Sequence, residues 1–474
     1  MNDEVHNEQS DSPPRPVGVN IVLGSVSLLA GCVSYWMMPE EMDEGARRMA
    51  AIFAGAVVLW ITEAIPLFAT SLCVIALEAW WVAVPEDLGM AMEYKTVFNS
   101  LSNPVIFLFL GGFILAKSVQ KERIDVQMAA LLLRAFGTRP WAVLGGIMLI
   151  TATFSMWMSN TATTAMMIVM VQPFLSRLEA RDRFRKALIL AVPFAANIGG
   201  IGTPIGTPPN AIAMAQLDDA GIGISFFTWM AFAFPLMLVA LTVMWAFLLT
   251  LFQPRGDRFE VKVEQDFKLT THAMVVYSTF AATVLLWLTG SWHGVPTAVV
   301  AVLPAAVLTV TQVISKEDFN RLEWNILMLI AGGIALGDGI TSTGLDTWIV
   351  KALPGEGLGF FGLAALISVL AVAMSTVISN SVATMILLPI GIAMAASLGS
   401  STIETQVLAA MCAIMASFAM GLPISTPPNA IAYGTGQIEN RDMLLVGGIT
   451  SIAAGLLVVI TGPTVISTIL NWLS

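Results

Sequence analysis

The stretch Thr207-Pro-Pro-Asn-Ala-Ile-Ala213 recurs unchanged, 219 residues later, as Thr426 to Ala432. Three further landmarks repeat in the same order at offsets of 220 or 221 residues: Phe98-Asn99 with Phe319-Asn320, Gly111-Gly112 with Gly332-Gly333, and Ser159-Asn160 with Ser379-Asn380. Four matches in one order at a nearly constant offset indicate a duplication. The chain therefore consists of two related halves.

The composition places both halves in a lipid bilayer. Of the 474 residues, 57% are hydrophobic and 11% are charged, whereas soluble proteins carry about 25% charged residues. A helix needs about 20 apolar residues to cross the hydrocarbon, and long apolar runs recur from Val17 to the C-terminus. We expect an all-α polytopic membrane protein. Repeats with interrupted helices at matching positions are typical of transporters.

Polar stretches divide the chain. Residues 1–17 form a polar tail that lacks the basic region and cleavage site of a signal peptide, so the apolar run at about 18–38 should remain as the first span. Residues 253–269 form a polar linker between repeat 1, at 18–252, and repeat 2, at 270–474.

Basic residues are distributed unequally between the repeats. Of 22 Lys and Arg, 18 precede residue 270; the stretch 117–139 holds five, whereas its equivalent at 338–359 holds one. The positive-inside rule then predicts that one repeat is inverted relative to the other. Five more basic residues lie at 177–186. A single broken span at 140–176 would put its two basic ends on opposite faces, so the cytoplasmic face stays open.

Each repeat has a polar break inside an apolar segment, Met156-Trp-Met-Ser-Asn-Thr-Ala-Thr-Thr164 and Thr376-Val-Ile-Ser-Asn-Ser-Val-Ala-Thr384. Hydrocarbon tolerates a break only inside protein or beside a wet cavity. Ser and Asn oxygens suit a hard cation such as sodium, and the half-helix that follows presents a positive end that favours an anion. Ser155 and Ser375 lie four residues before the motif serines, on the same helix face, and extend each set of oxygens.

The two Thr-Pro-Pro-Asn motifs are typical of helix starts. Thr207 and Thr426 are predicted N-caps, and the prolines that follow fit the first helical position, where no amide donor is missed. Four glycines before the first motif permit close approach and exposed carbonyls: Gly199, Gly200, Gly202 and Gly206. Carbonyl oxygens can hold sodium while helix N-termini hold a carboxylate.

The duplicated motifs contain no Lys, Arg or His. An anion bound there would be held by hydroxyls, amides, helix ends and bound cations. Cation coupling is then a physical need, because a dianion without compensation is costly in a low dielectric. Glu63 is expected to cap a helix junction.

Other classes of protein are disfavoured. A membrane-embedded hydrolase would need a His-Glu-x-x-His or Gly-x-Ser-x-Gly motif, and an ATP-driven pump would need a Gly-x-x-x-x-Gly-Lys-(Ser/Thr) loop; none occurs. Basic clusters with interleaved aromatics are absent, so no nucleic-acid partner is expected. The cysteines lie in apolar runs without paired spacing and are interpreted as small hydrophobic residues: Cys32, Cys73 and Cys412.

The motifs together resemble the divalent anion:sodium symporter family over nearly the whole chain. They are Trp60-Ile-Thr-Glu-Ala-Ile-Pro66, the two Ser-Asn motifs and the two Thr-Pro-Pro-Asn motifs. The resemblance implies sodium-coupled transport of C4-dicarboxylates such as succinate, malate and fumarate, and not an enzyme. It also implies about 11 spans, two re-entrant hairpins, a homodimer and an elevator mechanism, here in a bacterial inner membrane.

The same resemblance assigns parts to each repeat. Scaffold helices correspond to 18–98 and 270–319, hairpins to about 99–135 and 320–352, and broken helices to 140–252 and 358–474. Asp338 is expected near the second hairpin's turn.

The family's site residues carry over to matching positions, with two or more sodium ions. The first sodium site corresponds to Ser155, Ser159, Asn160 and Gly206. The second corresponds to Ser375, Ser379, Asn380 and Ser425. Substrate contacts correspond to Asn160, Thr161, Thr207, Asn380, Ser381, Thr426 and Pro427.

One departure from the family pattern bears on specificity. The commonest dicarboxylate pattern ends both Ser-Asn motifs in Thr, whereas the second motif here ends in Ser381. The hydroxyl is kept and a methyl is lost, which leaves substrate choice open. A carrier of sulfate or another inorganic dianion, and a sodium-independent dicarboxylate exchanger, remain alternatives. The intact Ser-Asn pairs argue against the exchanger.

Overall fold

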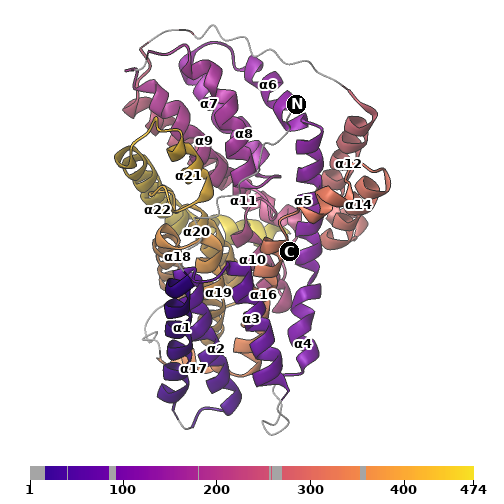
Figure 1. Ribbon diagram of the computed structural model, residues 1–474, viewed down its shortest axis with the longest axis vertical. Coiled ribbons are helices and arrows are strands. Elements are labelled where there is room, and N and C mark those ends of the chain that lie inside the picture. Colours follow the sequence, from indigo (N-terminus) through magenta and orange to yellow (C-terminus); the bar gives the residue numbers. More distant parts are fainter. Residues whose placement is uncertain are drawn as a thin grey trace.

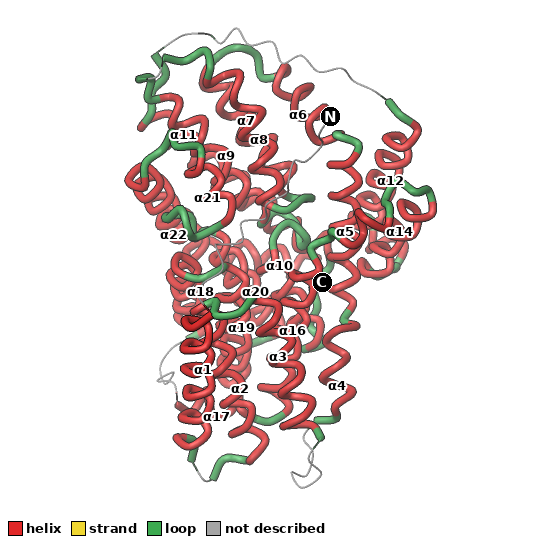
Figure 2. Tube along the Cα trace, in the orientation of Figure 1, coloured by secondary structure: helices red, strands yellow, loops and turns green. Residues whose placement is uncertain are grey.

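The computed structural model describes residues 17–39, 41–84, 92–179, 181–255, 258, 269–352 and 359–473. Every regular element in this part of the chain is helical (Figures 1 and 2). The polar tail predicted at 1–17 and most of the linker predicted at 253–269 lie outside the described residues.

Repeat 1 contributes the first eleven α-helices, with a π-helical turn, η1, and a short 3₁₀ turn, η3, between them. They are α1 (Val17–Met37), α2 (Glu44–Thr62), α3 (Leu67–Leu77), η1 (Glu78–Ala83), α4 (Tyr94–Asn99), η3 (Ser100–Ser102), α5 (Pro104–Lys121), α6 (Ile124–Ala135), α7 (Pro140–Ser155), α8 (Asn160–Leu175), α9 (Phe184–Gly200), α10 (Pro208–Asp219) and α11 (Phe226–Leu251).

Repeat 2 contributes the other eleven. They are α12 (Thr271–Leu288), α13 (Gly290–His293), α14 (Thr297–Val310), α15 (Lys316–Asn320), α16 (Trp324–Ser342), α17 (Leu345–Ala352), α18 (Phe360–Val377), α19 (Asn380–Ser397), α20 (Thr402–Ser417), α21 (Pro427–Gly434) and α22 (Asn440–Leu473).

Apolar helices of membrane-spanning length dominate both repeats. In the described part, nine helical segments are long and apolar enough to cross a bilayer, and four shorter apolar helical segments accompany them. The prediction of an all-α polytopic membrane protein is confirmed. Glu63 follows α2 in a left-handed conformation, with φ 47°, and so ends that helix at the predicted junction.

The polar breaks are the turns of two helical hairpins. α7 and α8 both pack along α9, and α18 and α19 both pack along α20. Placed end to end, α7 and α8 would extend about 48 Å, whereas α9 is about 25 Å long at about 1.5 Å per residue, so the two helices lie side by side. The Ala152 end of α7 and the Asn160 end of α8 both contact the same end of α9, at Gly199 and Gly200.

This pairing corrects the hairpins predicted at 99–135 and 320–352. Beyond its short turn with α6, α5 packs on α14, whereas α6 packs on α7 and α8; likewise α16 packs on α3, whereas α17 packs on α19. A hairpin at 140–175 brings its two basic ends to the same end of the helix pair, so the charge conflict of a single broken span disappears. The sequence signal for this hairpin was the apolar stretch 140–176, which is interrupted by polar residues and is nearly twice as long as one span.

The repeats hold each other through exchanged contacts. Gly111 on α5 lies against the Ala301 carbonyl on α14, and its counterpart Gly332 on α16 lies against Ser71 on α3. A Cβ at either glycine would overlap these atoms, so each position requires glycine. At these two positions a helix of each repeat therefore approaches closely a helix of the other repeat.

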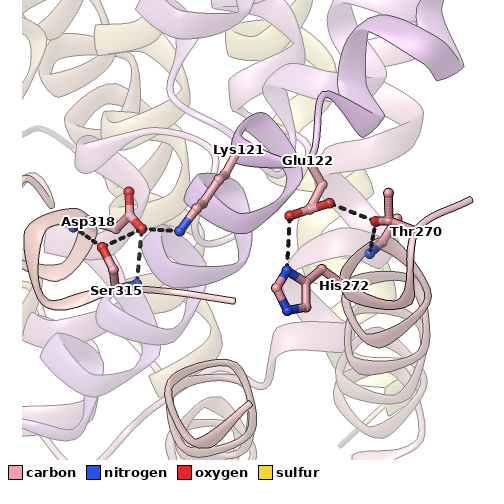
Figure 3. A network of polar contacts seen from close by, with 7 residues as sticks. Lys121, Glu122, Thr270, His272, Ser315 and Asp318 are labelled. Carbon is pink, nitrogen blue, oxygen red and sulfur yellow. Dashed lines mark hydrogen bonds and ion pairs between the residues drawn. The ribbon is translucent and has the colours of Figure 1, made fainter. Parts of the chain in front are cut away.

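A polar network ties the end of α5 to repeat 2 (Figure 3). The Lys121 ammonium lies 2.5 Å from the Asp318 carboxylate, which also accepts hydrogen bonds from the backbone and side chain of Ser315. Next to Lys121, Glu122 accepts a hydrogen bond of 2.9 Å from the Thr270 hydroxyl, and its other oxygen lies 3.8 Å from His272 Nδ1. These contacts fix the α5–α6 turn against both α12 and α15.

Candidate functional site

The first hairpin tip gathers three predicted sodium ligands. α7 ends at Ser155 and α8 begins at Asn160, after Ser159 caps it by accepting a hydrogen bond of 3.4 Å from the Ala162 amide. The buried Ser155 hydroxyl donates to Asn160 Oδ1 at 2.5 Å. The break therefore exposes both side-chain oxygens and the positive end of α8 to the same small region.

Two glycines bring backbone carbonyls to that tip. A Cβ at Gly200 would lie 2.6 Å from Asn160 Oδ1 and 3.1 Å from the Gly206 carbonyl oxygen. Gly200, which follows Gly199 at the end of α9, thus allows Asn160 and Gly206 to approach each other. We call Ser155, Ser159, Asn160, Gly200 and Gly206 cage 1; its side-chain and carbonyl oxygens are all neutral.

The second hairpin tip has the same residue types in a different hydrogen-bonding state. Ser379 caps α19 by accepting from the Val382 amide at 3.3 Å. The Ser375 hydroxyl and Asn380 Oδ1 are buried, and neither has a hydrogen-bond partner among the described residues. Ser425 reaches this tip by donating to the Thr376 carbonyl at 3.1 Å. We call Ser375, Ser379, Asn380 and Ser425 cage 2.

The asparagines of the Thr-Pro-Pro-Asn motifs shape the loops beside both cages. Asn210 Nδ2 donates to the Gly200 carbonyl at 3.1 Å and to the Thr203 carbonyl at 2.8 Å. Asn429 Nδ2 donates to the carbonyls of Met420 and Leu422 at 3.0 and 2.9 Å. Thr203 and Leu422 occupy matching positions in the two repeats, and Asn210 Nδ2 also lies 3.5 Å from the carbonyl of Ile201, which matches Met420. Sequence reasoning gave Asn210 and Asn429 no role of their own, although their recurrence in two identical stretches was a signal that both are needed.

The Thr-Pro-Pro starts agree with the prediction in part. α10 and α21 begin at Pro208 and Pro427, as predicted. Thr426 accepts a hydrogen bond of 3.3 Å from the Asn429 amide, but Thr207 occupies the N-cap position without a side-chain capping bond. Both threonines therefore occupy the predicted N-cap position with nearly the same extended backbone, and only Thr426 makes a side-chain capping bond.

The motifs of one repeat face helices of the other. α21 packs on α8 and α9, while α10 packs on α19 and α20. Asn197 Nδ2 on α9 donates to the Thr426 hydroxyl at 3.1 Å and to Asn429 Oδ1 at 3.3 Å. Sequence reasoning missed Asn197, because its partners lie in the other repeat. The Thr-Pro-Pro-Asn motif of repeat 2 is thus attached to the helix that supports cage 1.

The predicted substrate contacts differ in exposure. Thr161 and Pro427 are exposed, and Asn160 and Asn380 are half-buried. Thr207, Ser381 and Thr426 are buried. The exposed and half-buried members lie at the first turns of α8, α19 and α21, where helix amides are free for an anion.

Two charged residues outside the motifs lie beside cage 1. The Glu323 carboxylate lies within hydrogen-bonding range of the Ser159 hydroxyl and within the electrostatic reach of Lys117. Glu323 is the N-cap residue of α16, and Lys117 lies in α5. The duplicated motifs themselves carry no charge. The structure adds an acid from α16 and a base from α5, which sequence reasoning did not connect with the motifs.

Comparisons with known proteins agree with this architecture. A family model described as citrate transporter matches residues 57–415. The sodium-dependent dicarboxylate transporter SdcS of Staphylococcus saprophyticus is 30% identical over 466 residues, which cover 90% of this chain and 87% of that protein. SdcS of Staphylococcus aureus USA300 is 29% identical over 481 residues, which cover 93% of this chain and 90% of that protein.

A solved structure shares the fold at low sequence identity. The YdaH transporter of Alcanivorax borkumensis, described as having an unusual topology, superposes with a TM-score of 0.57 at 13% identity, over 94% of this chain and 98% of that one. The resemblance drawn from the motifs is confirmed by the family model and the relatives. The chain belongs to the citrate transporter family and is a multi-pass transporter of the cell membrane.

Proposed function

We propose that this protein carries C4-dicarboxylates, such as succinate, malate and fumarate, across the membrane on a sodium gradient. The observation that carries the proposal is the pair of buried oxygens in cage 2, Ser375 Oγ and Asn380 Oδ1, that have no partner in the described part of the chain. Buried polar atoms are almost always satisfied. A sodium ion bound between them would satisfy both, and the names of the relatives point the same way.

The donor sets suit sodium better than a transition metal. The side-chain and carbonyl oxygens of both cages are neutral, and the described residues contain no group of three His, Cys, Asp or Glu able to hold a metal. Hard cations prefer oxygen ligands, while transition metals favour imidazole and thiolate. We assign one sodium to cage 1 and one to cage 2.

The anion would bind between the cages, at the helix starts. We assign its contacts to the set carried over from the family: Asn160, Thr161, Thr207, Asn380, Ser381, Thr426 and Pro427. Each helix N-terminus interacts with an anion by only about 1 kcal/mol, which does not offset the cost of burying a dianion. The bound sodium ions supply the remaining compensation, so substrate and sodium would favour each other's binding.

Transport would proceed by an elevator movement in a homodimer. The resemblance to the divalent anion:sodium symporters implies both, and the exchanged contacts of α5 with α14 and of α16 with α3 provide two matching interfaces between the repeats. Cysteines introduced beside Gly206 and Ser425 should react with an impermeant thiol reagent from opposite sides under different ion conditions. Reaction of both from one side under all conditions would exclude the movement, and cross-linking in membranes tests the dimer.

Uptake of labelled succinate into proteoliposomes tests the function. We expect accumulation with an inward sodium gradient, little with potassium or protons, and competition by malate and fumarate but weakly by sulfate. Equal accumulation under potassium with succinate inside would identify an exchanger. Stronger competition by sulfate than by dicarboxylates would identify an inorganic dianion carrier.

A further inference from the structure

A buried carboxyl group outside both cages has no hydrogen-bond partner in the described part of the chain. Glu78 begins the π-helical turn η1, its side chain is 0% exposed, and neither of its carboxylate oxygens has a hydrogen-bond partner among the described residues. Burying a carboxylate without a counter-charge is unfavourable. π-Helical turns and ionisable residues at membrane depth both occur preferentially at functional positions.

Glu78 packs against α16, which carries a second acid. A Cβ at Gly339 on α16 would lie 3.0 Å from Glu78 Oε1, so Glu78 packs on the backbone next to Asp338, whose charge acts on it. Gln216 on α10 lies close to Gly337, on the other side of Asp338, and its Nε2 is also buried and unpartnered in the described part. An acid of repeat 1 thus lies within the electrostatic reach of an acid of repeat 2, while the unsatisfied amide of Gln216 lies on another side of α16.

The described helices packed around Glu78 supply no cation that acts on it. α3 and η1 pack on α2, α4 and α16. The ionisable groups on these elements are Glu44, Arg47 and Arg48 on α2, Cys73 on α3, Tyr94 and Lys95 on α4, and Asp338 on α16. Arg47 and Arg48 both pair with Glu44, and Arg48 also donates to the Trp81 carbonyl. Among the described groups, only Asp338 acts on Glu78 through its charge.

A series of acids leads from the surface to Glu78. Asp219 at the end of α10 is exposed and accepts a hydrogen bond of 2.8 Å from Asn103. Asp338 is half-buried, and its charge acts on both Asp219 and Glu78. Exposure therefore falls stepwise along the three acids. No described group of three metal-ligating side chains exists, so a proton fits this position better than a metal ion.

We propose that Glu78 is a proton-binding site, reached from solvent past Asp219 and Asp338, at the contact between α3–η1 of repeat 1 and α16 of repeat 2. The proton neutralises the enclosed carboxyl and comes from water, so no further reactant is needed. Because the site lies between helices of different repeats, a shift of α16 relative to α3 changes the surroundings of the proton. This proposal is independent of which anion is carried.

Infrared difference spectroscopy on the purified full-length protein tests the site. We expect a protonated-carboxyl band at neutral pH that shifts in deuterium oxide and is absent in Glu78→Gln, a neutral variant of nearly the same shape. Glu404→Gln is the matched control, since a glutamine at that position preserves the capping box with Ser401, and it should keep the band. A wild type without this band, or a Glu78→Gln protein that retains it, would overturn the proposal.

Asp338→Asn provides a second test that keeps Glu78 in place. Removing the neighbouring like charge should make Glu78 easier to ionise, so the band should disappear at a lower pH than in the wild type. An unchanged midpoint would show that Asp338 and Glu78 do not share a site.

Discussion

Cage 1 and cage 2 have the same frame but differ in how their oxygens are used. In both repeats, the asparagine of Thr-Pro-Pro-Asn binds two carbonyls of the preceding loop. In cage 1, however, the serine hydroxyl is hydrogen-bonded to the asparagine oxygen at 2.5 Å, whereas in cage 2 both atoms lack partners among the residues that the structure describes. The duplication thus preserves the asparagine contacts that hold the loop backbone, whereas the hydrogen bonding of the cage oxygens has diverged. We expect cage 2 to bind sodium first, because Asn160 Oδ1 in cage 1 already accepts a hydrogen bond, whereas Asn380 Oδ1 in cage 2 accepts none from the described residues.

The charged residues around the two cages also differ, and this difference favours cation binding at cage 1. Glu323 and Lys117 lie beside cage 1, and the position matching Glu323 in repeat 1, at an offset of 221, is Ser102. A carboxylate near cage 1 would attract a cation to oxygens of which one already accepts a hydrogen bond. The two sites therefore reach sodium binding by different means.

The largest expected effect comes from removing the motif asparagines. Asn160→Ala and Asn380→Ala should each reduce succinate uptake to background, because each removes an oxygen of a cage and a side chain assigned to the anion. Expression in the membrane should be unaffected, since both positions are half-buried. Near-normal uptake by either variant in proteoliposomes would show that the cage containing that asparagine is not needed for transport.

Exchanging the third motif residue should alter specificity rather than activity. Ser381→Thr makes the second motif match the first, and adds one methyl at a buried position. A methyl in a tight pocket changes preference by roughly 1–3 kcal/mol, so relative uptake of succinate, citrate and sulfate should shift by about ten-fold or more. Thr161→Ser is the matched change in repeat 1 and should have a smaller effect, since Thr161 is exposed. Identical substrate profiles would place Ser381 outside the site.

Truncating the upstream serines should separate the two cages. Ser155→Ala and Ser375→Ala should each raise the sodium concentration needed for half-maximal uptake by about ten-fold, which corresponds to about 1.4 kcal/mol. Without sodium, Ser155→Ala should lower the Tm because it removes a hydrogen bond worth about 1 kcal/mol, whereas Ser375→Ala removes an unsatisfied hydroxyl and should leave the Tm unchanged or raised. Equal Tm shifts in the two variants would contradict the difference between the cages.

The smallest effect should come from the contact of Lys121 with Asp318, which has no counterpart in the other repeat because Ser342 occupies the matching position. Burial raises the pKa of Asp318, but the hydrogen bonds from Lys121 and Ser315 outweigh it and hold that pKa below its ordinary value. The stabilisation should therefore be present above the ordinary range of an aspartate and be lost as the pH falls through the lowered pKa.

Lys121→Met should remove this stabilisation, which we expect to be about 1 kcal/mol or less at a partly exposed pair. Thermal unfolding of the wild type and the variant at neutral and acidic pH measures it. The difference in Tm should shrink at acidic pH; a constant difference would mean that the ammonium contributes through packing alone.

Local features of the site could be predicted from sequence, whereas helix pairing could not. The breaks at Ser159 and Ser379 and the helix starts at Pro208 and Pro427 follow from residue type and spacing. Whether α8 folds back on α7 depends on both helices packing along α9, a contact that no sequence pattern shows. The length of the stretch 140–176 and the basic residues at both of its ends were indirect signals of it. Glu323 and Asn197 were missed because their partners lie in the other repeat.

Binding of succinate to the purified protein, measured while sodium replaces potassium at constant ionic strength, tests the central claim most directly. If sodium ions in the two cages compensate the dianion, the affinity for succinate should rise with sodium, and the affinity for sodium should rise by the same factor with succinate, because coupling is reciprocal. Both effects should be lost in Asn380→Ala. Equal binding of succinate in sodium and in potassium would contradict the account.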